Sequence, residues 1–482
     1  MITDRKSRGQ YYTPDAVAAS LVRWAVRNQS DRLLDPSCGD GRFLAHHGNA
    51  TGVDSSQDAL QTAKIRCPSA RTFLSDFFVW AEDAGDKYDA VVGNPPFIRY
   101  QRFNGPIRER ALRLARKQGV ELSRLSSSWA PFLVVACGLL SPGGRIAFVV
   151  PAELGHAPYA APVLEFLFRK FDFVNVVAVR EKIFPDLSED AWLLYADGFG
   201  GSTSRIGLTI WPRFKSSATP PKPNKWVGLE DWKRGGCRLR KHLLPSEVLA
   251  QYNWALDQTG VVSLGSLAKV SIGYVSGDND FFHLSPSQAA ELGIPNHLLR
   301  VSIRNGAQLR PRRVDDETVR SWVEADLRVL LLNLAGAKKL PAGVRAYLAS
   351  DAGERAKERY KCRMRTPWYA VPDVRSPDGF LTYMNGRDPE IVLNRADCVC
   401  TNSLLAVRLM ANAPVSKLVR GWRQPLARLS QELEGHPLGG GMLKLEPGEA
   451  SRVHLPLRNI RNLDDQLLEE GIGLMRSWRH YG

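Results

Sequence analysis

Four short apolar runs within the first hundred residues each lead to a polar residue. Each run has the length of a buried strand, and helix-like segments lie between the runs. This alternation indicates an α/β fold with a parallel sheet, whose strands share one carboxyl edge where ligands bind. Any one of the polar residues alone is better explained as a helix cap or a solvated turn, but four in succession predict one site. The four are Asp35, Asp54, Asp76 and Asn94.

The fourth run ends in the sequence GNPPF at residues 93–97. Proline fixes its own φ and keeps the residue before it out of the helical region, so the carbonyls of Asn94 and Pro95 lie in a stiff, extended turn. The Asn94 side chain and the Pro95 carbonyl are two hydrogen-bond acceptors, and Phe97 offers a flat face. These groups suit a planar ligand with an exocyclic amine. The alternative is a surface proline turn without chemistry.

A glycine-containing turn over residues 36–44 follows the first run and leads into a helix. Gly39 and Gly41 permit positive φ and close approach of the backbone to a ligand. The third glycine of a dinucleotide-binding fingerprint is absent, because Leu44 occupies its position. The turn alone is therefore a weak signal. Asp54 strengthens it, since an acidic residue closing the next strand holds ribose hydroxyls in such folds.

The order of these motifs resembles that of a known family. The motifs are GQYYTP at 9–14, DPSCGDG at 35–41, Asp54, Asp76 and NPPF at 94–97. They resemble the amino-methylating DNA methyltransferases that use S-adenosylmethionine, in the class of TaqI- and Eco57I-like modification methylases, over about residues 7–200. NPPF alone also resembles the NPPY motif of protein-glutamine and some RNA methyltransferases. Its combination with GQYYTP is much more specific to DNA adenine-N6 enzymes.

The resemblance implies a fold and a cofactor. The fold is a Rossmann-like, mostly parallel, seven-stranded methyltransferase sheet, followed by a mixed α+β target recognition domain. Thr13 is expected to contact the methionine carboxylate of S-adenosylmethionine, Asp54 its ribose hydroxyls and Asp76 its ring amine. The implied cofactor site is completed by Tyr12, Asp35, Pro36, Cys38, Gly39, Gly41 and Asn94. For Cys38, a small packed side chain is the favoured alternative.

The implied reaction is methyl transfer to the N6 amine of adenine in a specific DNA sequence, as the modification step of a restriction-modification system. That amine is a poor nucleophile, because its lone pair is delocalised, and it is reachable only when the base is extruded from the duplex. The Asn94 oxygen and the Pro95 carbonyl would hold its N–H groups and aim the lone pair at the methyl group. Phe97 would stack on the base. The resemblance assigns a second base contact to Phe184, for which a core position is the alternative.

Three other functions stay open at this stage. A cytosine-N4 DNA methyltransferase shares the turn, but such enzymes more often carry serine at position 94. A methyltransferase for RNA or a protein amide also shares it, but often lacks an opening like GQYYTP. A non-catalytic specificity subunit with a decayed fold is disfavoured, because all the expected cofactor and catalytic positions are intact.

The positive charge of the chain is concentrated in its second part. Residues 1–200 hold 24 of the 65 Lys and Arg and 22 of the 50 Asp and Glu, so their net charge is +2 and the remainder carries +13. The basic part is expected to hold a polyanion, double-stranded DNA. A Pro-, Ser- and Lys-rich stretch at 215–225 indicates a linker, so we expect a catalytic domain over 1–225 and a target recognition domain over 226–482. Its candidate DNA contacts are Lys361, Arg363 and Arg365, beside Trp368 and Tyr369, and a solvated basic face is the alternative.

The spacing of the metal-ligating residue types predicts no metal site. The seven cysteines contain no CxxC pair, and the nine histidines are scattered. We expect reduced thiols and a cytoplasmic location in a bacterium or archaeon. The longest apolar run, residues 130–140, is too short to cross a bilayer, so no membrane association is expected. A monomer is expected, and a separately encoded restriction endonuclease is a candidate partner.

Overall fold

The computed structural model describes residues 13–185, 190–217, 222–309 and 313–481. The chain forms two compact units, Met1–Pro245 and Ser246–Gly482. The first unit extends past the domain boundary expected at residue 225. The reason is that residues 225–234 add a strand and a helix to the first unit: strand β9 (Lys225–Gly228) pairs antiparallel with β8 (Arg205–Trp211), and helix α8 (Leu229–Arg234) follows it.

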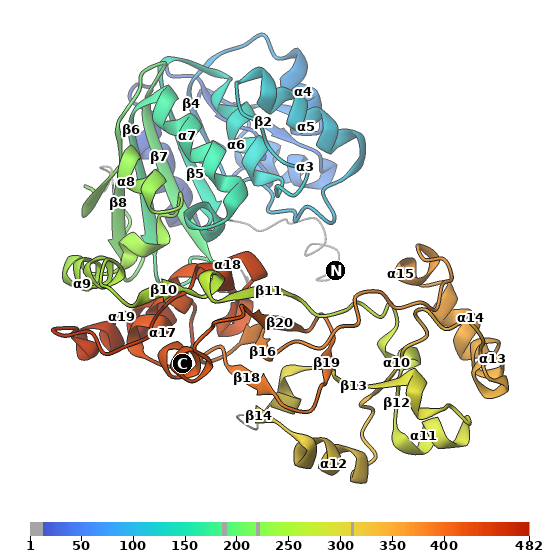
Figure 1. Cartoon of the computed structure of the whole chain (residues 1–482). Helices are drawn as coiled ribbons and strands as arrows, with labels where there is room; N and C mark the ends of the chain where they lie inside the picture. The colour runs from blue at the N-terminus through green and yellow to red at the C-terminus, as the bar shows by residue number, and fades with distance from the viewer. Residues whose placement is uncertain (1–12, 186–189, 218–221, 310–312, 482) are drawn as a thin grey trace. The chain divides into compact units, whose positions relative to one another are not determined.

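The first unit is built on one nine-stranded sheet in the order β3-β2-β1-β4-β5-β7-β6-β8-β9 (Figure 1). Strands β3, β2, β1, β4 and β5 run parallel, and β7 is antiparallel to both of its neighbours. The expected mostly parallel methyltransferase sheet is confirmed, and β8 and β9 extend it beyond seven strands. The other strands are β1 (Leu33–Asp35), β2 (Ala50–Asp54), β3 (Arg71–Leu74), β4 (Tyr88–Gly93), β5 (Leu140–Pro151), β6 (Phe171–Val179) and β7 (Ala191–Phe199).

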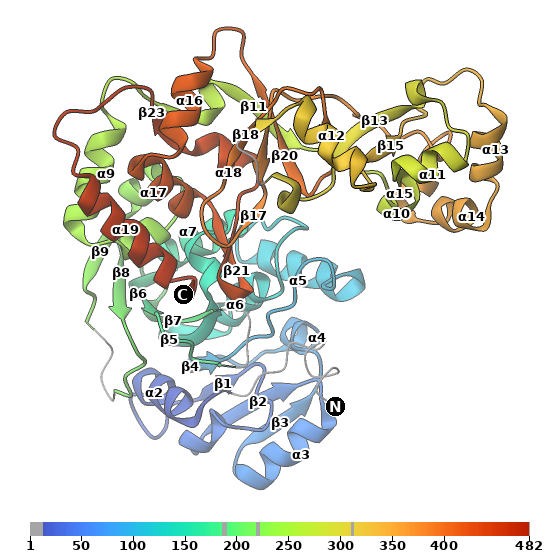
Figure 2. The same ribbon diagram turned by 90° about the horizontal axis from the view of Figure 1, so that it is seen from below.

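Helices pack on both faces of this sheet (Figures 1 and 2). Central strand β5 is apolar on both sides, and its residues 146–150 are fully buried, as expected of a strand covered on two faces. Helix α6 (Trp129–Cys137) is apolar all round and wholly buried, so it lies inside the unit rather than on its surface. The remaining helices are α2 (Asp15–Ala25), α3 (Gln57–Arg66), α4 (Phe77–Asp83), α5 (Gly105–Lys117) and α7 (Ala161–Lys170).

The described residues of the second unit form four smaller sheets, in the orders β10-β23, β11-β20-β16-β18-β14, β12-β15-β13-β19 and β17-β22-β21. Its mixture of short strands and helices confirms the expected α+β architecture. The strands are β10 (Val261–Ser263), β11 (Ala268–Ile272), β12 (His283–Leu284), β13 (Leu299–Ile303), β14 (Arg313–Val314), β15 (Leu330–Leu332), β16 (Gly379–Thr382), β17 (Met384–Asn385), β18 (Ile391–Asn394), β19 (Val399–Cys400), β20 (Leu404–Leu409), β21 (His436–Leu438), β22 (Met442–Lys444) and β23 (His454–Pro456).

Three hydrophobic cores stabilise the described part of this unit. The first contains residues of 274–399, including the β12-β15-β13-β19 sheet. The second groups β11, β16 and β20 with residues 418–455, and the third groups Ile303, Trp322 and Val329 with Phe380, Val392 and Leu404. The described part of the chain contains no helix long and apolar enough to span a membrane. The helices are α9 (Ser246–Leu256), α10 (Asn279–Phe282), α11 (Pro286–Glu291), α12 (Asp316–Glu324), α13 (Ala342–Leu348), α14 (Asp351–Lys357), α15 (Tyr360–Arg363), α16 (Val415–Trp422), α17 (Pro425–Glu434), α18 (Pro447–Arg452) and α19 (Asp465–Ser477).

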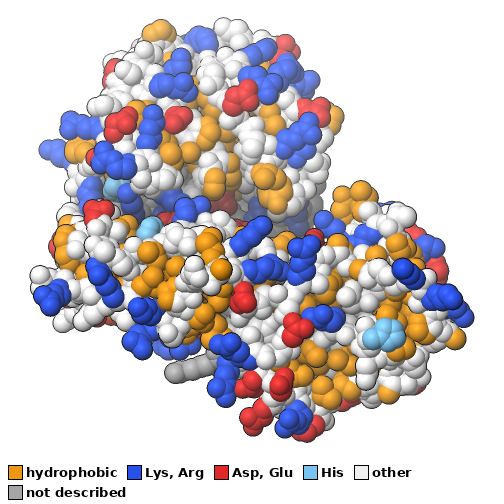
Figure 3. Space-filling model, in the orientation of Figure 1, with side chains coloured by type: hydrophobic (Ala, Val, Ile, Leu, Met, Phe, Trp, Pro, Cys, Tyr) orange, Lys and Arg blue, Asp and Glu red, His pale blue; other side chains and the backbone are white. Residues whose placement is uncertain are grey.

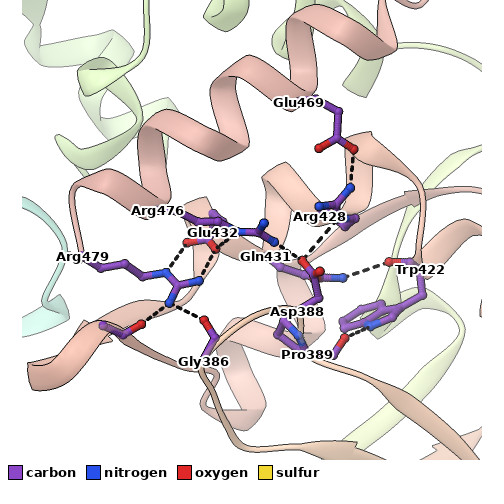
Figure 4. Close-up of polar contacts among 11 residues, drawn as sticks. Gly386, Asp388, Pro389, Trp422, Arg428, Gln431, Glu432, Glu469, Arg476 and Arg479 are labelled. Atoms are coloured by element: carbon purple, nitrogen blue, oxygen red, sulfur yellow. Dashed lines mark hydrogen bonds and ion pairs between the residues drawn. The ribbon is translucent and has the colours of Figure 1, made fainter. Parts of the chain in front are cut away.

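An ionic network joins α17 and α19 to the loop after β17, and its Arg479 and Glu432 side chains are buried (Figure 4). The Arg479 guanidinium donates to both carboxylate oxygens of Glu432, at 3.1 and 2.8 Å, and to the Gly386 carbonyl at 2.7 Å. Arg476 and Arg428 both donate to Asp388, at 2.5 and 3.2 Å. Because these charges pair with one another inside the unit, the network fixes the C-terminal helix in place.

Candidate active site

A cavity opens at the carboxyl ends of β1 to β4 in the first unit. The part of its wall at the four strand ends includes Pro36, Ser37, Gly39, Asp54, Asp76 and Asn94. The structure thus brings five of the predicted site residues together around one cavity, with Ser37 beside them. The predicted Tyr12 lies outside the described residues.

Asp54, at the end of β2, is held by two backbone donors. The Gly39 N–H donates to one carboxylate oxygen at 2.9 Å, and the Ser56 N–H donates to the other at 2.8 Å. Gly39 adopts a φ of +51°, which glycine reaches without strain. These bonds lock the turn after β1 onto the end of β2, so the carboxylate has a fixed direction in the cavity wall.

Asp76 combines two roles that the sequence presented as alternatives. It is the N-cap of α4, and its Oδ1 accepts from the N–H groups of Phe78 and Val79 at 2.9 and 3.2 Å. It also lines the cavity. Because one oxygen takes both cap bonds, and none to Oδ2 is seen within the described chain, the second oxygen suits a donor in the cavity.

An aromatic and apolar wall stands beside Asp76, and sequence reasoning missed it. The Phe77 and Phe132 ring centroids are 4.3 Å apart, and those of Phe78 and Phe103 are 6.2 Å apart. Ile98 and Ile107 complete this wall. The pair FF directly after Asp76 was a usable signal, whereas Phe103, Ile107 and Phe132 come from α5, α6 and the loop before α5, which only the fold brings to the cavity.

The Asn94 side chain, just after β4, is oriented by a residue far away in sequence. Its Nδ2 donates to the Thr13 hydroxyl at 3.2 Å, and its main-chain carbonyl accepts from the Ser37 hydroxyl at 3.2 Å. Thr13 is buried and stands two residues before α2. The structure therefore couples Thr13 to the turn at residues 93–97.

Ser128, which precedes α6, clamps the next part of the turn, and no motif had marked it. Its hydroxyl donates to the Pro96 carbonyl and accepts from the Ile98 N–H at 2.9 Å. Its own N–H donates to the Ile98 carbonyl at 3.0 Å. With three bonds to two residues, Ser128 fixes the path of the chain directly after Asn94 and Pro95.

Asp35 lies beneath the cavity rather than in its wall. It is fully buried, its Oδ1 accepts from the Ser37 N–H at 3.1 Å, and its Oδ2 has no hydrogen-bond partner among the described residues. Burial raises the pKa of this carboxyl well above its usual range. A Cβ at Gly93 would come within 3.1 Å of Oδ1, so the side chain occupies the space between β1 and β4.

Cys38 and Gly41 have packing roles in the structure. A Cβ at Gly52 would lie 2.8 Å from the Cys38 Sγ, which shows that the thiol packs directly on β2, and burial raises the pKa of that thiol. Gly41, at a φ of +83°, lies against α3, where its Cβ would be 3.1 Å from Ala63. Both residues shape the turn without lining the cavity.

The aromatic residues expected to contact the base lie together in the hydrophobic core. Phe184 is buried and Phe97 is half-buried, and both pack in the cluster that contains α2. Pro95 is buried as well. Contact of Phe97 and Phe184 with a target base stays a prediction.

The second unit carries a basic groove beside the end of β11. Its cationic residues are Lys269, Lys361, Arg365, Arg375 and Arg408. Ile272 and Met364 line the same groove and are 47% and 70% exposed, so apolar surface lies among the charges. Figure 3 shows Lys and Arg side chains gathered over the part of this unit that carries β11.

The three predicted DNA contacts, Lys361, Arg363 and Arg365, differ in their exposure and in whether they line this groove. Arg365 is bound to the chain itself, because it donates to the carbonyls of Val275 and Ser276 at 2.5 and 2.6 Å. Lys361 is exposed and lines the groove, whereas Arg363 is exposed but outside it. Trp368 packs on Phe281 and Phe282 and supports the fold.

The fold and its edge cavity define a methyltransferase, and comparison with known families specifies it further. Three family models match the chain: N-6 DNA Methylase over residues 2–63, Eco57I restriction-modification methylase over residues 48–184, and the C-terminal domain of Type II methyltransferase M.Eco57I over residues 238–478. The last covers half of the chain. The chain therefore belongs to the Eco57I-like family of Type II restriction-modification methyltransferases, which confirms the expected class.

Individual relatives agree with this assignment. Type II methyltransferase M.AccI of Acinetobacter calcoaceticus is 19% identical, covering 99% of this chain and 90% of its own. M.XamI of Xanthomonas campestris pv. amaranthicola is 23% identical, covering 93% and 85%. The structure of the Type IIL restriction-modification enzyme MmeI in complex with DNA has a TM-score of 0.51 and 12% identity over 92% of this chain. This chain spans 62% of that protein's length, and the likeness is one of fold.

Proposed function

We propose that this chain transfers a methyl group from S-adenosylmethionine to the N6 amine of an adenine in a specific sequence of double-stranded DNA. One observation carries the proposal: Asn94 lines the same cavity as Asp54 and Asp76. Methyl transfer requires that the acceptor amine and the cofactor meet in one place. A hydrogen-bond acceptor for the amine and two carboxylates for the cofactor stand there together.

The cavity residues fit this cofactor. The Asp54 carboxylate, fixed by two N–H donors, is a suitable acceptor for the two ribose hydroxyls. Asp76 stands beside the aromatic wall of Phe77 and Phe132, which suits a purine ring whose amine donates to the carboxylate. When bound, S-adenosylmethionine supplies a methyl group that is already activated by its positive sulfur. The chain therefore needs no strong base.

In this proposal, the turn at residues 93–97 positions the target amine and polarises it through hydrogen-bond acceptors. The bond from Asn94 to Thr13 turns Nδ2 toward α2 and sets the direction of the amide oxygen. The Ser128 hydroxyl donates to the Pro96 carbonyl. The main-chain acceptor that we assign to the target amine is therefore the carbonyl of the preceding residue, Pro95. Two acceptors on the N6 protons favour a pyramidal nitrogen with its lone pair directed at the methyl group. One N6 proton then passes to solvent.

The second unit is proposed to bind the DNA. Its groove presents five cations and exposed apolar side chains, which suit phosphates and base edges together. We further propose that the enzyme acts as a monomer and that a cognate endonuclease is encoded separately.

The test is single-molecule sequencing of DNA from cells that express the chain, with an Asn94→Ala variant as control. N6-methyladenine in one recurrent motif, absent in the control, is the expected result. Methylation of cytosine N4 instead would overturn adenine specificity. Unmodified DNA together with methyl transfer to RNA or protein in vitro would overturn the DNA assignment.

A further inference from the structure

The basic groove of the second unit contains one acidic side chain. Asp373 lines it together with the five cations. Within the described residues, its carboxylate forms no ion pair or hydrogen bond with any of them. A carboxylate that no cation neutralises weakens the attraction of a groove for phosphate. Attraction of DNA by charge alone therefore does not explain why Asp373 lies in this groove.

The cations around Asp373 divide into two groups. Arg365 and Arg408 are engaged by the protein, since Arg365 donates to main-chain carbonyls and Arg408 donates to the Ser271 hydroxyl at 3.0 Å. Lys269, Lys361 and Arg375 are exposed. The exposed group suits phosphates, whose contacts position a protein on DNA but carry no sequence information. Asp373 is repelled by phosphate, so its partner in this groove is a hydrogen-bond donor.

We infer that Asp373 determines part of the sequence specificity by accepting a hydrogen bond from the N4 amine of a cytosine in the recognition sequence. This inference rests on the proposed function. In the major groove, cytosine presents the N4 amine as a donor, whereas adenine presents its amine beside the N7 acceptor. A carboxylate has only acceptors and is repelled by that N7. Cytosine is therefore the base that matches Asp373.

The backbone at Asp373 allows variants that do not strain the loop. Its φ is +58°, a region that asparagine and glycine also adopt readily. Asp373→Asn removes the charge and keeps the shape, and Asp373→Gly removes the side chain. Asp397→Asn is the matched control, because Asp397 has a φ of +50° in the same unit but pairs with Arg300 outside the groove.

The experiment measures methylation by the full chain of a DNA library randomised at each position of the motif. We expect the wild type to prefer C·G at one position by about 10- to 100-fold, and both Asp373 variants to lower that preference to within about threefold. The other positions and the Asp397→Asn profile should not change. The variants should also bind unrelated DNA more tightly, since a repulsive charge is gone.

Each alternative outcome is decisive. If both variants keep the wild-type preference at every position, the inference is wrong while the proposed function stands. If the Asp373 variants fail to methylate DNA, their base preference is measured by competition binding with the same library. An unchanged preference in that binding assay also overturns the inference. A wild-type motif without a fixed C·G pair overturns it as well. Absence of DNA methylation by the wild type would instead refute the proposed function.

Discussion

The Asn94 side-chain amide donates a hydrogen bond to the Thr13 hydroxyl, at 3.2 Å, and so joins the turn at residues 93–97 to the segment before α2. An amide can present either its oxygen or its nitrogen to a ligand. Thr13 fixes that choice by occupying the nitrogen. Under the proposed mechanism, its buried hydroxyl is a positioning group for the acceptor that would meet the target amine.

This relationship predicts different losses for the two partners. Asn94→Ala should nearly abolish methylation and leave cofactor affinity largely intact, because the lost oxygen acts on the nucleophile. Thr13→Val should lower kcat by about 3- to 10-fold, the equivalent of one neutral hydrogen bond, and Thr13→Ser should restore it. Single-turnover kinetics and calorimetry with S-adenosylmethionine separate these effects, and melting curves confirm folding. Turnover of Asn94→Ala at the wild-type rate would contradict the mechanism.

Asp54→Ala should weaken S-adenosylmethionine binding by about 10- to 100-fold, because hydrogen bonds to a charged acceptor contribute about 1.5–3 kcal/mol. It should also lower the melting temperature, because the N–H groups of Gly39 and Ser56 lose their acceptor. Asp58→Ala, an exposed change in the first turn of α3, is the control and should alter neither. Calorimetry that gives the wild-type affinity for Asp54→Ala would exclude the ribose role.

Ser128→Ala should lower kcat by about 10-fold or more with little change in cofactor affinity. The variant frees the Pro96 carbonyl and the Ile98 N–H together, so the turn loses its fixed path. Ser126→Ala is a matched control, since that hydroxyl is equally buried but has no hydrogen-bond partner among the described residues. Equal kcat values for the two variants would show that the clamp does not serve catalysis.

Much of the first unit could be predicted because its signals are local. A short apolar run that ends in Asp or Asn places a polar group at the carboxyl edge of a parallel sheet, and Asp54, Asp76 and Asn94 do meet there. Whether a strand-end side chain faces the ligand or the core depends on packing with the next strand. That is why Asp35, one of four similar residues, lies beneath the cavity instead.

The remainder of the site depends on segments that the fold alone brings together. Ser128, Phe103 and Phe132 lie in or beside α5 and α6, with no motif around them, and reach the cavity only because those helices pack beside α4. In the second unit, Arg365 looked like a DNA contact by its charge. Its bonds to the carbonyls of Val275 and Ser276 are invisible in a sequence, since they join residues far apart along the chain.

The buried pair of Arg479 and Glu432 predicts a strong effect on stability. Their side chains are 0% and 3% exposed, so removing one partner leaves the other charged and buried. Arg479→Met should cost the second unit about 3–5 kcal/mol, whereas Arg300→Met, which breaks the exposed pair with Asp397, should cost about 1 kcal/mol or less. Hydrogen exchange of the α17 and α19 amides in urea reports the loss where it arises.

The double variant Arg479→Met with Glu432→Leu distinguishes charge from packing. If the cost arises from a buried carboxylate that has lost Arg479 and keeps Arg476 beside it, replacing that carboxylate by an apolar side chain should recover a large part of the cost. If the cost arises from lost packing or from the freed carbonyl of Gly386, which Arg479 also binds, the double variant should be no more stable than Arg479→Met. Similar exchange rates for Arg479→Met and Arg300→Met would show that the network does not hold α19 in place.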